Sequence, residues 1–124
     1  MRRSLLIALP LLAGFATPVH AQPISWGMAQ CSALMEVMES HVSRQPHKGY
    51  LADAADLMYQ AALEKGQSEG QDATQLGRVY QSKQDEWVSM GYSMAFKTEF
   101  RDWVDYCKAL ARGYDIALDT SMLH

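Results

Sequence analysis

Three side chains early in the chain have the types and spacing of a site for a soft metal ion. Met35, Met38 and His41 stand at positions i, i+3 and i+6. Thioether sulfur and imidazole nitrogen are ligands that Cu(I) accepts. At helical periodicity the three turn through about 300°, so the two methionines share an apolar stripe and His41 lies toward its edge. Methionine on such a stripe usually fills a core, and a copper site is therefore the alternative hypothesis here.

The two cysteines are the next candidates for chemistry. Cys31 and Cys107 stand near the two ends of the chain that follows position 21. In an oxidising compartment two cysteines commonly form a disulfide. Neither belongs to a Cys-x-x-Cys pair or has the context of a papain-like or thioredoxin-like nucleophile. We predict a disulfide between them, and two separate reactive thiols are the alternative.

Acid–base catalysis has less support. Catalytic carboxylates need different environments, usually facing a cleft, but most acidic pairs at helical spacing fall off the apolar stripes, beside lysine and arginine. Glu-x-x-His, His-Glu-x-x-His, Cys-x-x-Cys-His and Gly-x-Ser-x-Gly motifs do not occur in the sequence. We therefore expect no di-iron, zinc-protease, c-type haem or serine-hydrolase site and no cofactor. We predict that the protein is not an enzyme; the alternative is a site assembled from dispersed residues.

Aromatic side chains indicate where a partner would bind. Trp26 precedes the first predicted helix, and Tyr92 and Tyr106 fit the apolar stripes poorly. Trp and Tyr are enriched at binding hot spots. If the three are exposed together, they form a partner-binding surface, and we expect the partner to be another protein. The alternative for Trp26 is packing over the end of the helices.

Helices must position these residues, because the apolar pattern is helical and no strand is convincing. The pattern predicts a helix over 30–44, ended by the proline at 46. A second helix is expected over 49–65, with Gly66 as its C-terminal cap and a polar loop over 66–71. Asp72 and Gln75 form a capping-box pattern at the start of a third helix.

The last stripe is the longest and the most aromatic in the chain. Its members are Phe96, Phe100, Trp103, Val104, Cys107, Leu110, Ala111, Tyr114, Ala117 and Leu118. A change of phase predicts a break over 91–93, and a single kinked helix over 72–119 is the alternative. The fold class is therefore all-α, a small bundle of about four helices with one disulfide joining the first and last helices.

The first 21 residues have the pattern of a cleaved secretory signal peptide. Arg2 and Arg3 precede an apolar run, and small or medium residues stand at 19 and 21. We expect a single helical domain over 22–124, periplasmic or secreted, with no membrane anchor after cleavage; a twin-arginine export signal is the alternative. Loss of two arginines leaves nine basic against 14 acidic residues, a balance that argues against nucleic acid as a partner.

These observations predict a non-catalytic exported helical binding or interaction protein, such as a chaperone-like, inhibitor or immunity-type partner. The alternative is a periplasmic copper-binding protein that uses the Met/His cluster. In architecture the chain resembles small exported helical proteins with a single disulfide, among them periplasmic acid-stress chaperones and immunity proteins. The resemblance implies a role in binding and assigns no residue.

Overall fold

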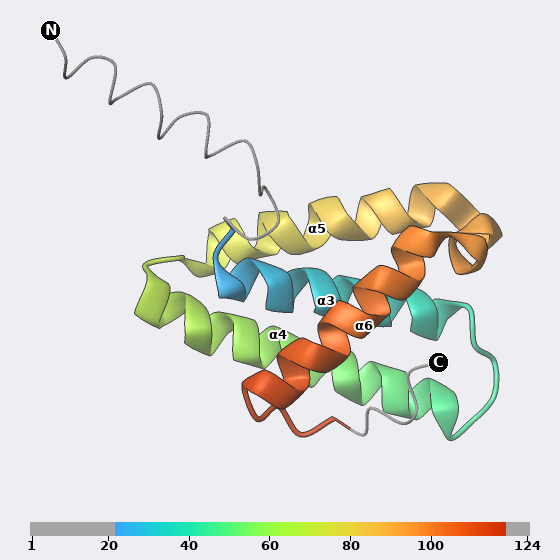
Figure 1. Cartoon of the computed structure of the whole chain (residues 1–124), viewed down its shortest axis with the longest axis horizontal. Coiled ribbons are helices and arrows are strands. Elements are labelled where there is room, and N and C mark those ends of the chain that lie inside the picture. The colour runs from blue at the N-terminus through green and yellow to red at the C-terminus, as the bar shows by residue number, and fades with distance from the viewer. Residues whose placement is uncertain (1–21, 119–124) are drawn as a thin grey trace, which may run out of the picture.

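The computed structural model describes residues 22–118, and within that range it contains four α-helices, one 3-10 helix and no strand (Figure 1). The elements are α3 (Ile24–Ser40), α4 (His47–Glu69), α5 (Ala73–Met90), η1 (Gly91–Phe96) and α6 (Thr98–Gly113). The predicted all-α bundle is confirmed. None of these helices is both long and apolar enough to cross a membrane. The predicted signal peptide over 1–21 and the end of the chain over 119–124 lie outside the described residues.

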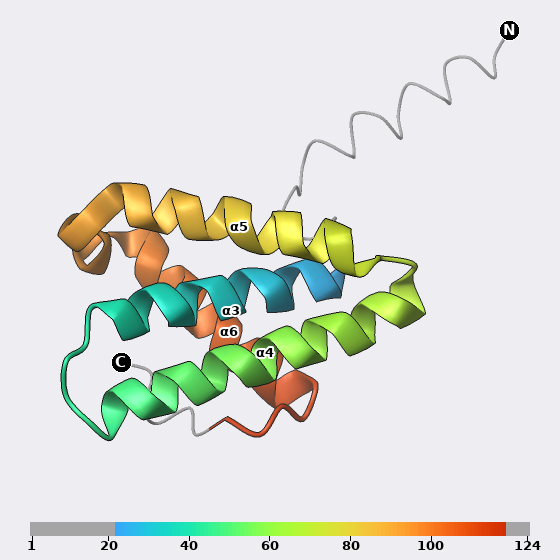
Figure 2. The same ribbon diagram turned by 180° about the vertical axis from the view of Figure 1, so that it is seen from behind.

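Helix α3 is the centre of the molecule. It lies between α4 and α5, and α6 crosses one face of this layer (Figures 1 and 2). Its buried residues run from Ser25 to Met38 and include small ones such as Ala29 and Ala33. A helix that is apolar on most of its circumference is stable when other helices surround it, which explains the central position.

The boundaries of α3 differ from the prediction of 30–44. The helix begins at Ile24 and ends at Ser40, so Trp26 lies inside its first turn rather than before it. Pro23 is the N-cap residue, and its carbonyl oxygen accepts hydrogen bonds from the N–H groups of Trp26 and Gly27. The first N–H groups of a helix have no partner within the helix itself, so this carbonyl satisfies two of them.

Helix α4 is longer than predicted, because Gly66 does not end it. Gly66 is a buried residue within the helix, and Gly70 is the C-cap, with a left-handed φ of 77°. A Cβ atom on Gly66 would lie 2.8 Å from Leu76 Cδ1 and 3.0 Å from the carbonyl oxygen of Gln71. Glycine at 66 therefore permits a close approach between α4 and the start of α5, and the predicted loop over 66–71 is largely helical.

Helix α5 begins and ends close to the predicted positions. The Asp72 carboxylate accepts from the Gln75 N–H at 2.8 Å, and the Gln75 side chain accepts from the Asp72 N–H at 3.0 Å, which confirms the capping box. The helix ends at Met90, and Gly91 has φ 58°. The break is confirmed, and a single kinked helix over 72–119 is wrong.

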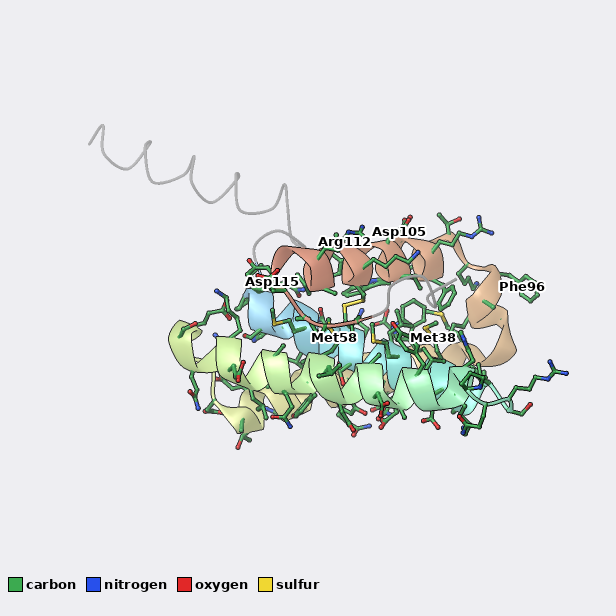
Figure 3. All side chains as sticks on the ribbon, turned by 90° about the horizontal axis from the view of Figure 1, so that it is seen from below. Met38, Met58, Phe96, Asp105, Arg112 and Asp115 are labelled. Atoms are coloured by element: carbon green, nitrogen blue, oxygen red, sulfur yellow. A yellow bond between two sulfur atoms is a disulfide. The ribbon has the colours of Figure 1, made fainter. Side chains whose placement is uncertain are left out.

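Two aromatic residues assigned to the last stripe are not in the core. Phe96, at the end of η1, is 87% exposed, and Figure 3 shows it projecting from the end of the bundle. The predicted stripe placed Phe96 in the core because it assumed a helix that already includes residue 96. The helix α6 starts only at Thr98. Tyr114 is likewise 43% exposed, because α6 ends at Gly113.

The disulfide joins the central helix to the crossing helix. Cys31 of α3 and Cys107 of α6 are bonded at an S–S distance of 2.08 Å, and both are buried. The predicted pairing is confirmed. Beside it the core is filled by large apolar side chains: Leu34, Met35, Leu51, Met58, Leu76 and Trp87. Trp87 packs edge-to-face with Phe100 at a centroid distance of 6.1 Å, which ties α5 to α6.

Candidate functional site

A groove of about 400 Å³ lies between the first half of α3 and the length of α5. Its lining residues are Trp26, Gln30, Gln75, Arg78, Val79, Ser82, Lys83 and Glu86. An aromatic ring, amides, a hydroxyl and both signs of charge meet there. A concave surface that combines apolar and convergent polar groups is the usual form of a binding site. We call this feature the α3–α5 groove.

Trp26 is held in a fixed orientation on the wall of the groove. Its indole Nε1 donates a hydrogen bond to the side-chain oxygen of Gln71 at 2.8 Å. Gln71 lies in the short connection between α4 and α5. The ring is only partly buried, so one part of it is anchored and another part is open to solvent. Such a ring loses little side-chain entropy when a partner packs on it.

Tyr106 of α6 lies against α3 next to the Trp26 end of the groove. A Cβ atom on Gly27 would lie 2.1 Å from the Tyr106 hydroxyl oxygen, so α6 approaches α3 this closely only because residue 27 is glycine. Burial raises the pKa of Tyr106, and a hydrogen bond with Gln22 lowers it in part. Gln22 also donates from Nε2 to Gln30 Oε1 at 2.8 Å, and this contact links Tyr106 to the lining of the groove.

One cation of the groove, Lys83, is held by an aromatic contact and by an ion pair. Lys83 Nζ lies 4.4 Å from the centre of the Trp103 ring of α6 and 3.0 Å from Glu86 Oε1. The Lys83 side chain is 11% exposed, so its ammonium group is held between α5 and α6. Arg78 is exposed on the same stripe of α5. The lining thus carries two cations and one carboxylate, although the whole chain has a formal net charge of −3.

A second polar arrangement joins α3 to α5 through Glu36. The Tyr80 hydroxyl donates to the Glu36 carboxylate, and Gln84 Nε2 donates to the same oxygen at 2.6 Å. Burial, followed by the hydrogen bond to Glu36 and then by the Glu36 charge, raises the pKa of Tyr80 well above its usual value. A phenol that holds its proton more firmly is a poor general base at neutral pH. This arrangement therefore favours a structural link over a catalytic one.

The structure brings two of the three residues of the predicted copper site to one cavity, and Met35 does not line it. Met35 is 1% exposed and lies in the core. Met38 and His41 line a different cavity, of about 210 Å³, together with His47 and Met94. Within residues 22–118 no three His, Cys, Asp or Glu side chains are placed to hold a metal ion together. The spacing in sequence thus identified two of the residues of this cavity and one that lies outside it.

Of the predicted partner-binding residues, two lie near the groove. Trp26 lines it, and Tyr106 packs against Gly27, the neighbour of Trp26 in sequence. The side chain of Tyr92 lies outside what the structure describes. A role for these residues in binding stays a prediction.

Sequence reasoning missed the polar side of the groove. Residues 75, 78, 82 and 86 follow one another at steps of three and four along α5, so they form one face of the helix. The sequence does contain a signal for this lining, because these polar residues form a stripe beside the apolar stripe of α5. It was overlooked because a polar helical face usually means only exposure to solvent.

Comparison with known proteins gives no relative. No protein family model matches the chain, and neither a curated protein nor a solved structure matches it. We therefore argue the function from the residues of the groove and from their chemistry.

Proposed function

We propose that the protein is a non-catalytic exported binding protein that holds a segment of a partner protein in the α3–α5 groove. The observation that carries this proposal is the orientation of Trp26, whose indole is fixed by Gln71 and open to the groove. Tryptophan and arginine are the residue types most enriched at binding hot spots, and Trp26 and Arg78 line the same groove. A chaperone-like, inhibitor or immunity-type role would each use such a site.

The charges of the groove favour an acidic segment. Lys83 is already engaged by Glu86 and Trp103, whereas the Arg78 guanidinium is exposed at the surface. Arginine binds carboxylates through two parallel hydrogen bonds, which gives both strength and orientation. We therefore expect the partner to place an apolar side chain on the Trp26 ring and a carboxylate next to Arg78.

The disulfide supports a location outside the cytosol. Bonds such as Cys31–Cys107 form and persist in oxidising compartments. The signal-peptide pattern over 1–21 supports the same location. The two observations are independent, because one concerns the folded domain and the other the segment before it. The periplasm or the extracellular medium is the proposed site of action.

The chemistry of the described side chains supports binding more than catalysis. The tyrosines with raised pKa, Tyr80 and Tyr106, are both shifted chiefly by burial. The shifts move these groups away from the neutral range, where a catalytic acid or base operates most effectively. The groove instead offers an aromatic surface, amides and a guanidinium, which are groups that recognise a ligand without reacting with it.

Site-specific crosslinking in intact cells tests the proposal. A photoreactive residue is placed at Ser82 on the groove and, in a second version, at Asp105 on the outer side of α6 (Figure 3). We expect one protein to be captured from position 82 and not from 105, and the purified form of that protein to bind the full chain directly. Equal capture from both positions, or captured proteins that do not bind when purified, would contradict the proposal.

A further inference from the structure

A second cavity lies at the opposite end of α3 from Trp26. It has a volume of about 210 Å³, and its lining comes from α3, α4, η1, α6 and the connection between α3 and α4. The residues are Met38, His41, Val42, His47, Leu51, Gly91, Met94, Ala95 and Phe100. Two methionines and two histidines thus line one small space, and Met94 reaches it from a distant part of the sequence. We call this feature the end cavity.

We infer that the end cavity is a binding site for a soft monovalent metal ion, Cu(I), with Met38, Met94, His41 and His47 as its ligands. This site is separate from the α3–α5 groove and does not depend on the function proposed for it. It differs from the copper site that the sequence suggested, because Met35 does not line the end cavity. His47 of α4 and Met94 of η1 instead join Met38 and His41.

The character of the lining selects a soft ion over a hard one. Thioether sulfur binds Cu(I) well, and imidazole also accepts copper, whereas Mg²⁺ and Ca²⁺ require carboxylate and carbonyl oxygens. The nine described lining residues include no Asp or Glu. A divalent ion would thus enter without charge compensation beside Val42, Leu51 and Phe100. A monovalent ion has the smaller desolvation cost in such surroundings.

The burial of the sulfur ligands supports the same choice. Met38 is 8% and Met94 is 3% exposed, so both side chains are already largely removed from water. His41 is exposed and His47 is half-buried, which places the imidazoles nearer the surface. The ion would enter past the imidazoles and be held from within by the thioethers. Metal sites need such an entry path as well as a set of ligands.

The ligands also lie on segments that a metal ion would tie together. His41 is the C-cap of α3, His47 is the first residue of α4, and Met94 lies in η1. A bound ion would thus link the α3–α4 connection to the α5–α6 connection. A ligand that binds the folded state but not the unfolded state raises the thermal stability, so loading should raise the melting temperature.

Anaerobic titration of the full secreted chain with Cu(I), against a chromophoric Cu(I) chelator, tests the site. The variants Met94→Leu and His47→Gln each remove one proposed ligand. Met35→Leu and Met58→Leu are matched controls, because both remove a buried thioether that does not line the end cavity. Circular dichroism melts of each metal-free variant establish that it is folded before titration.

We expect one Cu(I) per chain, an affinity reduced at least about tenfold in both ligand variants, and an affinity within about twofold of the wild type in both controls. The methyl NMR signals of Met38 and Met94 should shift on loading, and those of Met35 and Met58 should not. Absence of binding, or a loss of affinity in Met35→Leu equal to that in Met94→Leu, would overturn the inference.

Discussion

At the scale of single residues, the proposed binding role of the α3–α5 groove depends on the orientation of a few side chains. In the proposed function Trp26 serves a partner because Gln71 accepts its indole hydrogen bond and leaves part of the ring open. Lys83 is held by Trp103 and Glu86, so Arg78 is the groove cation best placed to meet a carboxylate. We expect the specificity of the groove to depend mainly on Trp26 and Arg78.

Tyr80 gives the fold a stability that is lost in alkali. An unfolded tyrosine ionises near pH 10, whereas burial and the Glu36 charge keep Tyr80 protonated to higher pH in the folded protein. Above about pH 10 the unfolded chain therefore releases a proton that the folded chain retains, and the folded state loses stability as pH rises. Below that pH the contribution is fully present.

The prediction is that Tyr80→Phe weakens this dependence. Urea unfolding at a series of pH values from 8 upward should show a shallower loss of the free energy of unfolding above about pH 10 in the variant than in the wild type. Tyr106→Phe should act in the same direction, because burial also raises the pKa of Tyr106. If the free energy of unfolding falls equally steeply with pH in the wild type and in both variants, these hydroxyl groups do not cause the loss of stability in alkali.

At the scale of elements, glycines decide how closely the helices approach one another. Gly27 lets the Tyr106 hydroxyl lie against α3, and Gly66 lets Leu76 lie against α4. Gly77 in α5 is different, because a Cβ atom there would meet only the Tyr59 hydroxyl oxygen, at 3.8 Å. Glycine is therefore required for close packing at 27 and 66, whereas at 77 there is room for a side chain.

Substitution by alanine should separate the two cases. Gly27→Ala should lower the free energy of unfolding by about 1–3 kcal/mol, because the new methyl group overpacks the contact between α3 and α6. Gly77→Ala should raise it by about 0.5–1 kcal/mol, because alanine is the better helix former and the site is open. Urea midpoints measure both changes, and destabilisation of equal size in the two variants would refute the close contact at Gly27.

The elements that could be read from the sequence are those with local signals. The start of α5 was predicted from Asp72 and Gln75 and its end from the change of phase near Gly91, and the structure confirms both. The sequence predicts the end of α4 too early, because Gly66 has the pattern of a cap, whereas its missing side chain permits close packing. That contact involves Leu76 of the next helix and has no signature in a single stretch of sequence.

At the scale of the whole molecule, the disulfide and the crossing of α6 over α3 are the main constraints. The pairing of Cys31 with Cys107 was predictable, because two cysteines on core-facing stripes have few other options. The α3–α5 groove was not, because the contacts beside it, Lys83 with Trp103 and Gly27 with Tyr106, join elements that are distant in sequence. Such distant contacts leave no periodic signal in the sequence.

Loss of the disulfide should destabilise the whole domain. The bond closes a loop of 76 positions, for which loop-closure entropy corresponds to about 4.5 kcal/mol. Reduction, or Cys107→Ser, should therefore lower the melting temperature by about 20 °C. Thermal melts with and without reductant measure the effect. A shift below about 5 °C, or two free thiols found by mass spectrometry in the protein from its native compartment, would contradict a stabilising disulfide.

The most direct test of the binding proposal is the affinity of the captured partner for two charge-reversed variants. Arg78→Glu changes the groove, and Arg112→Glu makes the same change at an exposed position near the end of α6 (Figure 3). Calorimetric titration should show an affinity at least about tenfold weaker for Arg78→Glu and one within about twofold of the wild type for Arg112→Glu. Equal affinities for the wild type and Arg78→Glu would contradict a binding role for the α3–α5 groove.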